Sequence, residues 1–96
     1  MKTKIESAVL IEKEAIAHLH FPKEDVLFVK EDITLRYEKL NNALSIGNLE
    51  HEKVIILFQD IQGLKKVDTT IWGVTDKEII LKKGVIIPIH RIENIF

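Results

Sequence analysis

The sequence predicts an α+β fold, in which one or two N-terminal helical segments pack on a small five-stranded antiparallel β-barrel. Residues 1–50 contain apolar residues at helical spacing. Residues 51–96 are rich in β-branched residues and contain 11 of the 16 Ile and three of the four Gly. The composition, 46% hydrophobic and 30% charged, is that of a folded domain.

The length predicts a single domain that comprises residues 1–96. Its two parts are a helical or strand-containing part, residues 1–50, and a β-meander, residues 51–96. A barrel of the size of the second part is marginal alone, because small domains bury too small a fraction of their surface. We therefore expect the helical part to cover one face or end of the barrel.

The clearest helix is predicted around Asp32 to Ile46. One apolar stripe, spaced four, three and four residues apart, is expected to face the core: Ile33, Tyr37, Leu40 and Leu44. Asp32 is a candidate N-cap, and Gly47-Asn48 is a candidate left-handed stop. The stripe extends back through Val29 and Val26, so the pattern allows one helix from Pro22 or two with a bend.

Residues Ala15 to Phe21 are predicted to form a strand. Ala15, Ala17, Leu19 and Phe21 alternate with more polar positions, although Glu12 to His20 also contains good helix formers.

The meander is predicted from runs of β-formers separated by turns. Strands are expected at residues 53–59, 66–75, 78–82, 85–87 and 94–96, with one 3-10 turn between Ile89 and Ile92. Gly73, inside the second run, indicates the bend or bulge that closes a small barrel. Val67, Thr69 and Ile71 alternate with Asp68, Thr70 and Trp72, and we expect Phe58 and Trp72 to pack in the core.

Three segments carry a resemblance: "KVIILFQDIQG", "TTIWGVTDKEIILKKG" and "VIIPIHRIENIF". Their order of apolar runs and turns resembles an SH3-like barrel, and the preceding helix gives the Sm-like arrangement. The chain is also similar to small uncharacterised bacterial proteins with a helical part before such a barrel. Sm-like proteins bind RNA, commonly through an Asn near the third strand. Here that strand reads "DKEIIL", so the resemblance does not transfer RNA-binding residues.

Charge and composition exclude several functions. There are 14 basic and 15 acidic residues, whereas a general nucleic-acid binder is usually clearly basic. The absence of cysteine excludes a thiol nucleophile and a thiolate metal site. We expect no catalytic, cofactor-binding or metal-binding residues, and the chain is expected not to be an enzyme.

One basic surface is a candidate binding rim, because its members lie at or near turns that can gather at one end of a barrel. They are Lys65, Lys66, Lys82, Lys83 and Arg91. The alternative, which we favour, is that these residues guard strand edges and keep the chain soluble.

Two further groups of residues, a histidine pair and several carboxylate pairs, have both a functional interpretation and an interpretation as ordinary surface. His18 and His20 share a face if their segment is a strand, as metal ligands do, but an ordinary exposed surface is the favoured interpretation. The paired carboxylates, such as Glu31 and Asp32, have lysines nearby and are interpreted as solvated surface.

The predicted function is that of a small non-enzymatic binding or assembly module, without a specific ligand. The alternative is a nucleic-acid-binding regulator that uses the turn lysines. Four consecutive apolar residues, Val26 to Val29, cannot all face one core, so we expect a homodimer. No apolar run is long enough for a signal peptide or membrane span, and we expect no membrane contact and a cytoplasmic location.

Overall fold

The computed structural model describes residues 2–96 and confirms the α+β class. Its one long helix is α2 (Lys30–Glu50), and α1 (Lys4–Ser7) is a single turn. The four-stranded sheet has the order β1 (Val9–Leu10), β3 (Gly63–Thr69), β2 (Val54–Asp60), β7 (Ile92–Ile95). The three-stranded sheet has the order β4 (Ile71–Val74), β5 (Glu78–Leu81), β6 (Ile86–Pro88). The three 3-10 turns are η1 (Lys13–His18), η2 (Lys82–Gly84) and η3 (Ile89–Arg91).

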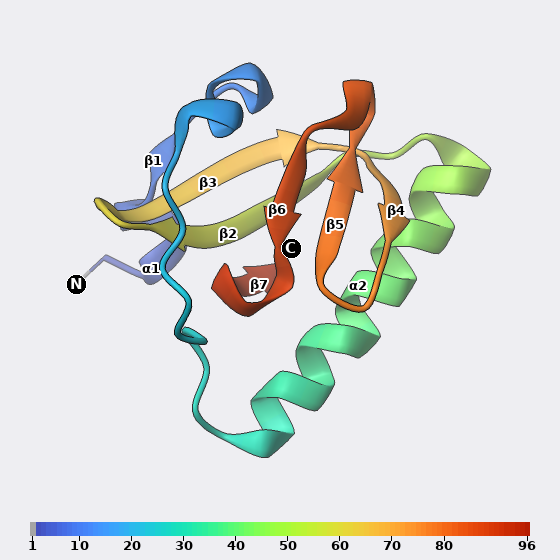
Figure 1. Cartoon of the computed structure of the whole chain (residues 1–96). Coiled ribbons are helices and arrows are strands. Elements are labelled where there is room, and N and C mark those ends of the chain that lie inside the picture. Colours follow the sequence, from blue (N-terminus) through green and yellow to red (C-terminus); the bar gives the residue numbers. More distant parts are fainter. Residues whose placement is uncertain (1) are drawn as a thin grey trace.

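The strands are arranged as two sheets and not as the closed five-stranded barrel that the sequence predicts (Figure 1). β7 returns to pair with β2, and the parallel strand β1 adds to the free edge of β3. The predicted strand over residues 66–75 is divided between the sheets, because the chain leaves one sheet at Thr70 and enters the other at Ile71.

The bend in this segment lies at Thr70 and not at Gly73. The other expected feature, a bulge, is confirmed beside Gly73: Ile71 is opposite Leu81 and Gly73 is opposite Ile80, so Trp72 is the extra residue. A Cβ at Gly73 would lie 3.3 Å from the flexible Cδ1 of Ile80. The glycine therefore permits close strand packing next to the bulge.

The remaining meander follows the sequence prediction closely. β2 lies within one residue of the expected range of 53–59, and Ile56, Leu57 and Phe58 are buried within it. The 3-10 turn expected between Ile89 and Ile92 is present as η3, and β7 is the expected short last strand. Asp60 organises the β2–β3 turn, since one of its carboxylate oxygens accepts hydrogen bonds from the Gln62 and Gly63 N–H groups.

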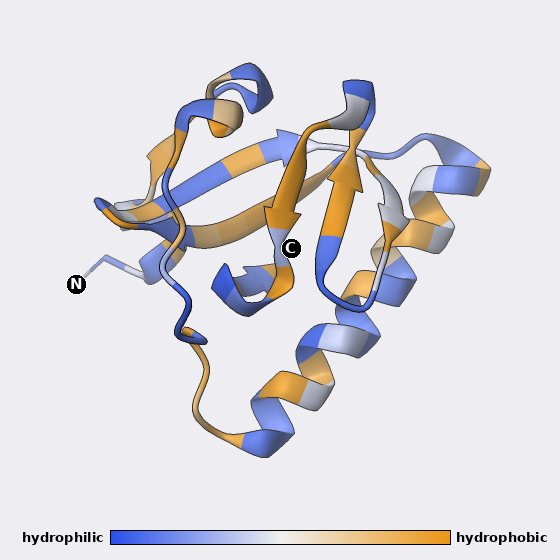
Figure 2. Ribbon diagram, in the orientation of Figure 1, coloured by the Kyte–Doolittle hydropathy of each residue, from blue (hydrophilic) through white to orange (hydrophobic). Residues whose placement is uncertain are grey.

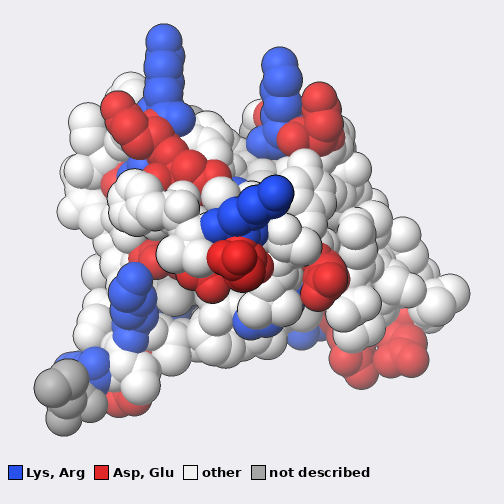
Figure 3. Space-filling model, turned by 90° about the horizontal axis from the view of Figure 1, so that it is seen from below, with Lys and Arg blue, Asp and Glu red and all other residues white. Residues whose placement is uncertain are grey.

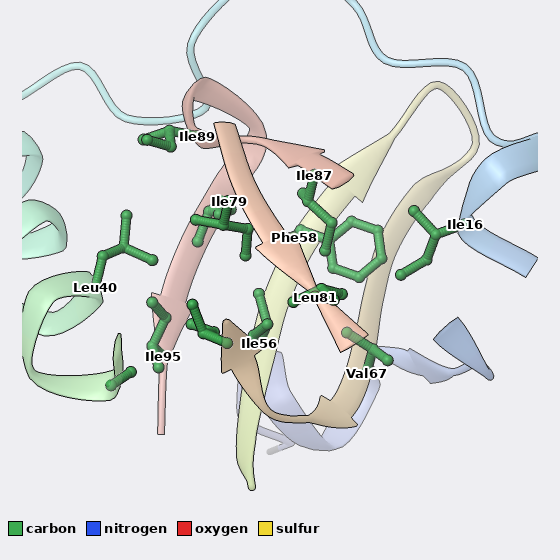
Figure 4. Packing of buried hydrophobic residues seen from close by; sticks show 13 residues of the cluster. Ile16, Leu40, Ile56, Phe58, Val67, Ile79, Leu81, Ile87, Ile89 and Ile95 are labelled. Carbon is green, nitrogen blue, oxygen red and sulfur yellow. The ribbon is translucent and has the colours of Figure 1, made fainter. Parts of the chain in front are cut away.

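The predicted strand at Ala15 to Phe21 is wrong. Residues 13–18 form η1, and only Ile16 among them is buried. Figure 4 shows its side chain directed toward Phe58 in the core. Ile16 anchors η1 in the core, and Leu19 and Phe21 after it pack against the same cluster. The helix formers around Ile16 favour the 3-10 conformation.

Helix α2 is longer than expected at its C-terminal end and does not begin at Pro22. Its N-cap position is Val29, and Asp32 lies in the first turn without capping the helix. The expected stop at Gly47-Asn48 is wrong, because the helix continues to Glu50 and His51 takes the left-handed conformation at φ 56°.

The buried face of α2 is also rotated relative to the predicted stripe. Leu40 is fully buried, as expected, whereas Tyr37 is exposed. The residues that α2 buries are Arg36, Leu40, Ala43 and Gly47. Gly47 faces the sheet so closely that a Cβ there would lie 2.5 Å from the Ile71 carbonyl oxygen.

One hydrophobic cluster combines residues of both halves of the chain (Figure 4). Ile16 and Leu40 come from the N-terminal half, and Ile56, Phe58 and Ile79 are among the members from the strands. Figure 2 shows that both sheets carry long hydrophobic stretches, whereas α2 alternates between hydrophobic and hydrophilic residues. α2 contacts β4 of one sheet and β7 of the other, so it lies against both.

We expect Gly47→Ala to lower the free energy of unfolding. Alanine gains about 1 kcal/mol in helix propensity over glycine, but overpacking a close contact typically costs about 1–3 kcal/mol. The Ile71 carbonyl belongs to the backbone and cannot move aside as a side chain could. We therefore expect the cost of overpacking to exceed the gain in helix propensity. Urea denaturation measures the difference, with Asn48→Ala on the exposed side of the same turn as the control. A Gly47→Ala protein as stable as Asn48→Ala would show that the helix is not held this closely.

Candidate functional site

Some residues of the predicted basic rim are held in contacts within the fold, and others are exposed. The buried Lys65 lies 2.7 Å from the carboxylate of Asp60, itself buried, and supports the β2–β3 turn. Lys66 donates a hydrogen bond to the Ile5 carbonyl at 2.8 Å. Lys82 and Lys83 are exposed in η2, where Lys83 has a φ of 67°. Nucleic-acid binding by this rim stays a prediction.

Arg91, the fifth member of the rim, is buried and ties two segments together. Its Nε donates to the Gln59 carbonyl at 3.1 Å, and its Nη1 donates to the Glu24 carbonyl at 2.7 Å. The guanidinium thereby joins the end of β2 to the irregular segment before α2. A substitution of Arg91 would affect folding as well as any binding.

The two histidines considered as metal ligands do not share a strand face. His18 ends η1, and His20 lies beyond it, where its carbonyl accepts a hydrogen bond from the Ile61 N–H. Within residues 2–96, no group of three or more His, Cys, Asp or Glu side chains is arranged to hold a metal ion.

An apolar hollow lies between α1, the segment before α2, α2 itself and β7. This apolar pocket has a volume of about 410 Å³. Its apolar lining residues are Ile5, Leu27, Leu35, Leu57 and Phe96. At its edge Lys4 lies 2.8 Å from Glu93, and Lys39 donates to the Asn94 side chain at 2.6 Å.

Arg36 fixes the wall of the apolar pocket. It is 5% exposed, and its two terminal nitrogens bind the two oxygens of Asp25 at 2.9 and 2.8 Å. Nη1 also donates to the Ile92 carbonyl at 3.1 Å, so the guanidinium joins α2, β7 and the segment before α2. The Nε of Arg36 has no hydrogen-bond partner among residues 2–96.

The pKa of Asp25 is lowered by this arrangement. Partial burial acts to raise it, but the hydrogen bonds from Arg36 and from the Leu27 N–H outweigh burial. The carboxylate therefore stays ionised and holds the Leu27 backbone in place. Neighbouring Phe28 is 91% exposed, and Val29 is also exposed, whereas Val26 and Leu27 are half-buried.

Of the two aromatic residues expected in the core, Phe58 is buried and Trp72 is not. Trp72 is 51% exposed on β4. The sequence contained the signal for this placement, because Trp72 alternates with buried Val67, Thr69 and Ile71 on the opposite face. Trp72 and His51 line two adjacent hollows, one of which also contains Lys82.

No family model, curated protein or solved structure matches the chain. Among residues 2–96, no helix combines the length and the apolar character needed to cross a bilayer.

We expect Asp25→Asn to lower the free energy of unfolding at neutral pH. The free energy of unfolding of the variant should also depend less on pH in the acidic range than that of the parent. Breaking the pair leaves the buried Arg36 charge without its partner, at a cost of about 2–4 kcal/mol. Because the folded pKa lies below the ordinary value of 3.8, this stabilisation is complete above that value and is lost as the pH falls through the folded pKa.

Urea denaturation of both proteins between about pH 7 and about pH 2 measures this contribution. The parent should be the more stable protein at neutral pH, and the difference should shrink in acid. Glu24→Gln, at the adjacent exposed carboxylate, is the control and should behave as the parent. A difference that is independent of pH would contradict the role given to the ionised Asp25.

Proposed function

We propose that the chain is a small non-enzymatic assembly module that pairs with a second copy of itself. The proposed contact surface consists of the apolar pocket and the exposed Phe28, which follows the lining residue Leu27 in the chain. We refer to this surface, formed by Leu27, Phe28, Leu35 and Phe96, as the Phe28 surface. The observation that carries the proposal is an almost fully exposed aromatic residue, Phe28, that directly follows Leu27, a lining residue of the apolar pocket.

The exposure of Phe28 supports a partner. Its 91% exposed side chain is the most exposed large apolar group in the described part of the chain, and Leu35 and Phe96 are 46% and 54% exposed. Figure 2 shows the hydrophobic stretch, in orange, where the chain enters α2. Contiguous exposed apolar residues commonly mark interaction sites. Phe28 is also held outward, since Asp25 and Arg36 fix the backbone next to it.

A second copy fits this surface because a two-fold axis makes every contact reciprocal. In the proposed dimer, Phe28 of each copy enters the apolar pocket of the other. The pocket adjoins Leu27, the immediate neighbour of Phe28. Burying a phenylalanine side chain contributes about 1.5–3 kcal/mol, and a symmetric contact does so twice.

The charges around the pocket suit self-association better than a strongly charged partner. Lys4 and Glu93 pair at its edge, and Asp32, Arg36 and Lys39 also line it. On the molecular face seen from below, acidic and basic side chains lie beside one another among uncharged surface (Figure 3). A surface with both signs can match its own copy, whereas a field of one sign would repel it.

The relation to an SH3-like or Sm-like barrel is also part of this proposal. The strand order of the meander, the one-turn η3 between β6 and β7, and the return of β7 to β2 support it. The two sheets would then be an opened version of that arrangement. Small β-folds of this kind offer surfaces and edges for binding rather than deep reactive pockets.

We expect the parent protein to be a dimer in multi-angle light scattering and Phe28→Ser to be a monomer. The matched control is Leu49→Ser, because Leu49 is 79% exposed at the opposite end of α2. It should remain a dimer. Both variants change exposed residues and should therefore fold, which circular dichroism verifies.

Two results would contradict this assembly. One is a parent protein that stays monomeric at high micromolar concentration. The other is an equal loss of dimer in Phe28→Ser and Leu49→Ser, which would point to nonspecific hydrophobic association.

A further inference from the structure

A second hollow, which shares no lining residue with the apolar pocket, combines an exposed tryptophan with several cationic groups. Four segments form it: η1, the chain that follows α2, the β3–β4 bend and η2. We call it the Trp72 pocket; it has a volume of about 300 Å³, and its lining includes Lys13, Lys53, Lys82, His51, Thr70 and Trp72. In Figure 1 these segments lie along the upper side of the two sheets.

The charge of the Trp72 pocket is predominantly positive. Three lysines line it and Asp68 is its one lining carboxylate in the described chain. Lys13 lies 3.2 Å from Glu14, whose pKa is lowered by its backbone hydrogen bond and by Lys13. Lys53 and Lys82 take part in none of the ion pairs found among residues 2–96. Two ammonium groups therefore remain available to an anion.

The fold brings the segments that carry Trp72 and the lysines to one hollow. The bulge on β4 turns Trp72 outward, and the left-handed His51 directs the chain from α2 past the same hollow to Lys53. Trp72 and His51 also line the neighbouring pocket formed with Gly47 and Asn48, so the indole is accessible from two hollows. Tryptophan is a strong stacking partner for flat heterocycles.

We propose that the Trp72 pocket binds a nucleoside phosphate, with the base stacked on Trp72 and the phosphate placed between Lys53 and Lys82. A stacking surface, two free ammonium groups and adjacent threonine hydroxyls match the parts of this ligand. The volume lies at the lower end of the range of small-molecule sites, which fits a mononucleotide. A free nucleotide and a unit of a single strand share this chemistry. The site is independent of the Phe28 surface.

Trp72 is the single tryptophan of the chain, so its fluorescence reports on this pocket directly. The parent protein is titrated at low salt with AMP, with adenosine, with inorganic phosphate and with a short single-stranded RNA. We expect AMP to change the fluorescence saturably, adenosine and phosphate to bind more weakly, and added salt to weaken AMP binding. Calorimetry serves as the second readout.

Lys53→Gln and Lys82→Gln should each weaken AMP binding about fivefold, the effect of losing one partly screened charge contact. The control Lys23→Gln removes an exposed lysine outside the pocket and should change nothing. Trp72→Leu, followed by calorimetry, should abolish the preference for AMP over phosphate. The Trp72 and lysine side chains are exposed or only partly buried, so these variants should fold.

Comparison of AMP, RNA and phosphate distinguishes the possible ligands of the Trp72 pocket. Binding of AMP with loss in the lysine variants supports a free nucleotide, and binding of RNA alone with the same losses supports a strand. Equal affinity for phosphate and AMP would overturn the role of the base. Absence of both a fluorescence change and heat for AMP and RNA at millimolar concentration would overturn the site, whether or not the protein is a dimer.

Discussion

The close approach of α2 to the strands is the constraint on which the rest of the structure depends. β4 belongs to one sheet and β7 to the other, and α2 contacts both. Gly47 permits this contact, because any Cβ there would meet the Ile71 carbonyl. Leu40 and Ala43, which precede Gly47 on the same face of the helix, then reach the shared core. A helix held even slightly farther from the strands would leave unfilled space along its whole buried face, which interiors packed as densely as crystals do not accommodate.

Two buried arginines fix the irregular chain between η1 and α2. This segment forms no strand, so it depends on Arg36 and Arg91 for partners. Val26 adds a backbone hydrogen bond to the His90 carbonyl at 2.9 Å. Of the two arginines, only Arg91 belongs to the predicted binding rim. The Asp25–Arg36 pair fixes the Leu27 backbone, next to the exposed Phe28. The same network therefore links the stability of the fold to the surface that we propose for assembly.

The sequence predicts the regular elements well and their placement poorly. The strands from Val54 onward follow from β-branched runs and turns, which are local signals. The bend at Thr70, the buried face of α2 and the burial of Arg91 depend on which surfaces meet, and no local pattern encodes that. Glycine is common at helix ends, which favours a stop at Gly47, whereas in the structure this residue allows a close contact. Hydrophobicity favours a core position for Trp72, although strand alternation correctly places it opposite Ile71.

Native-state amide hydrogen exchange tests most directly the claim that α2 unites both sheets. If it does, the slowest amides of α2, around Leu40 and Ala43, must open with the same free energy as those of β2 and β5, since the helix and the sheets would unfold together. Denaturant should then lower all these free energies with one common slope. If the α2 amides instead exchange at a clearly lower free energy while the strands stay protected, the helix is an accessory to an independently stable sheet structure and does not unite the two sheets.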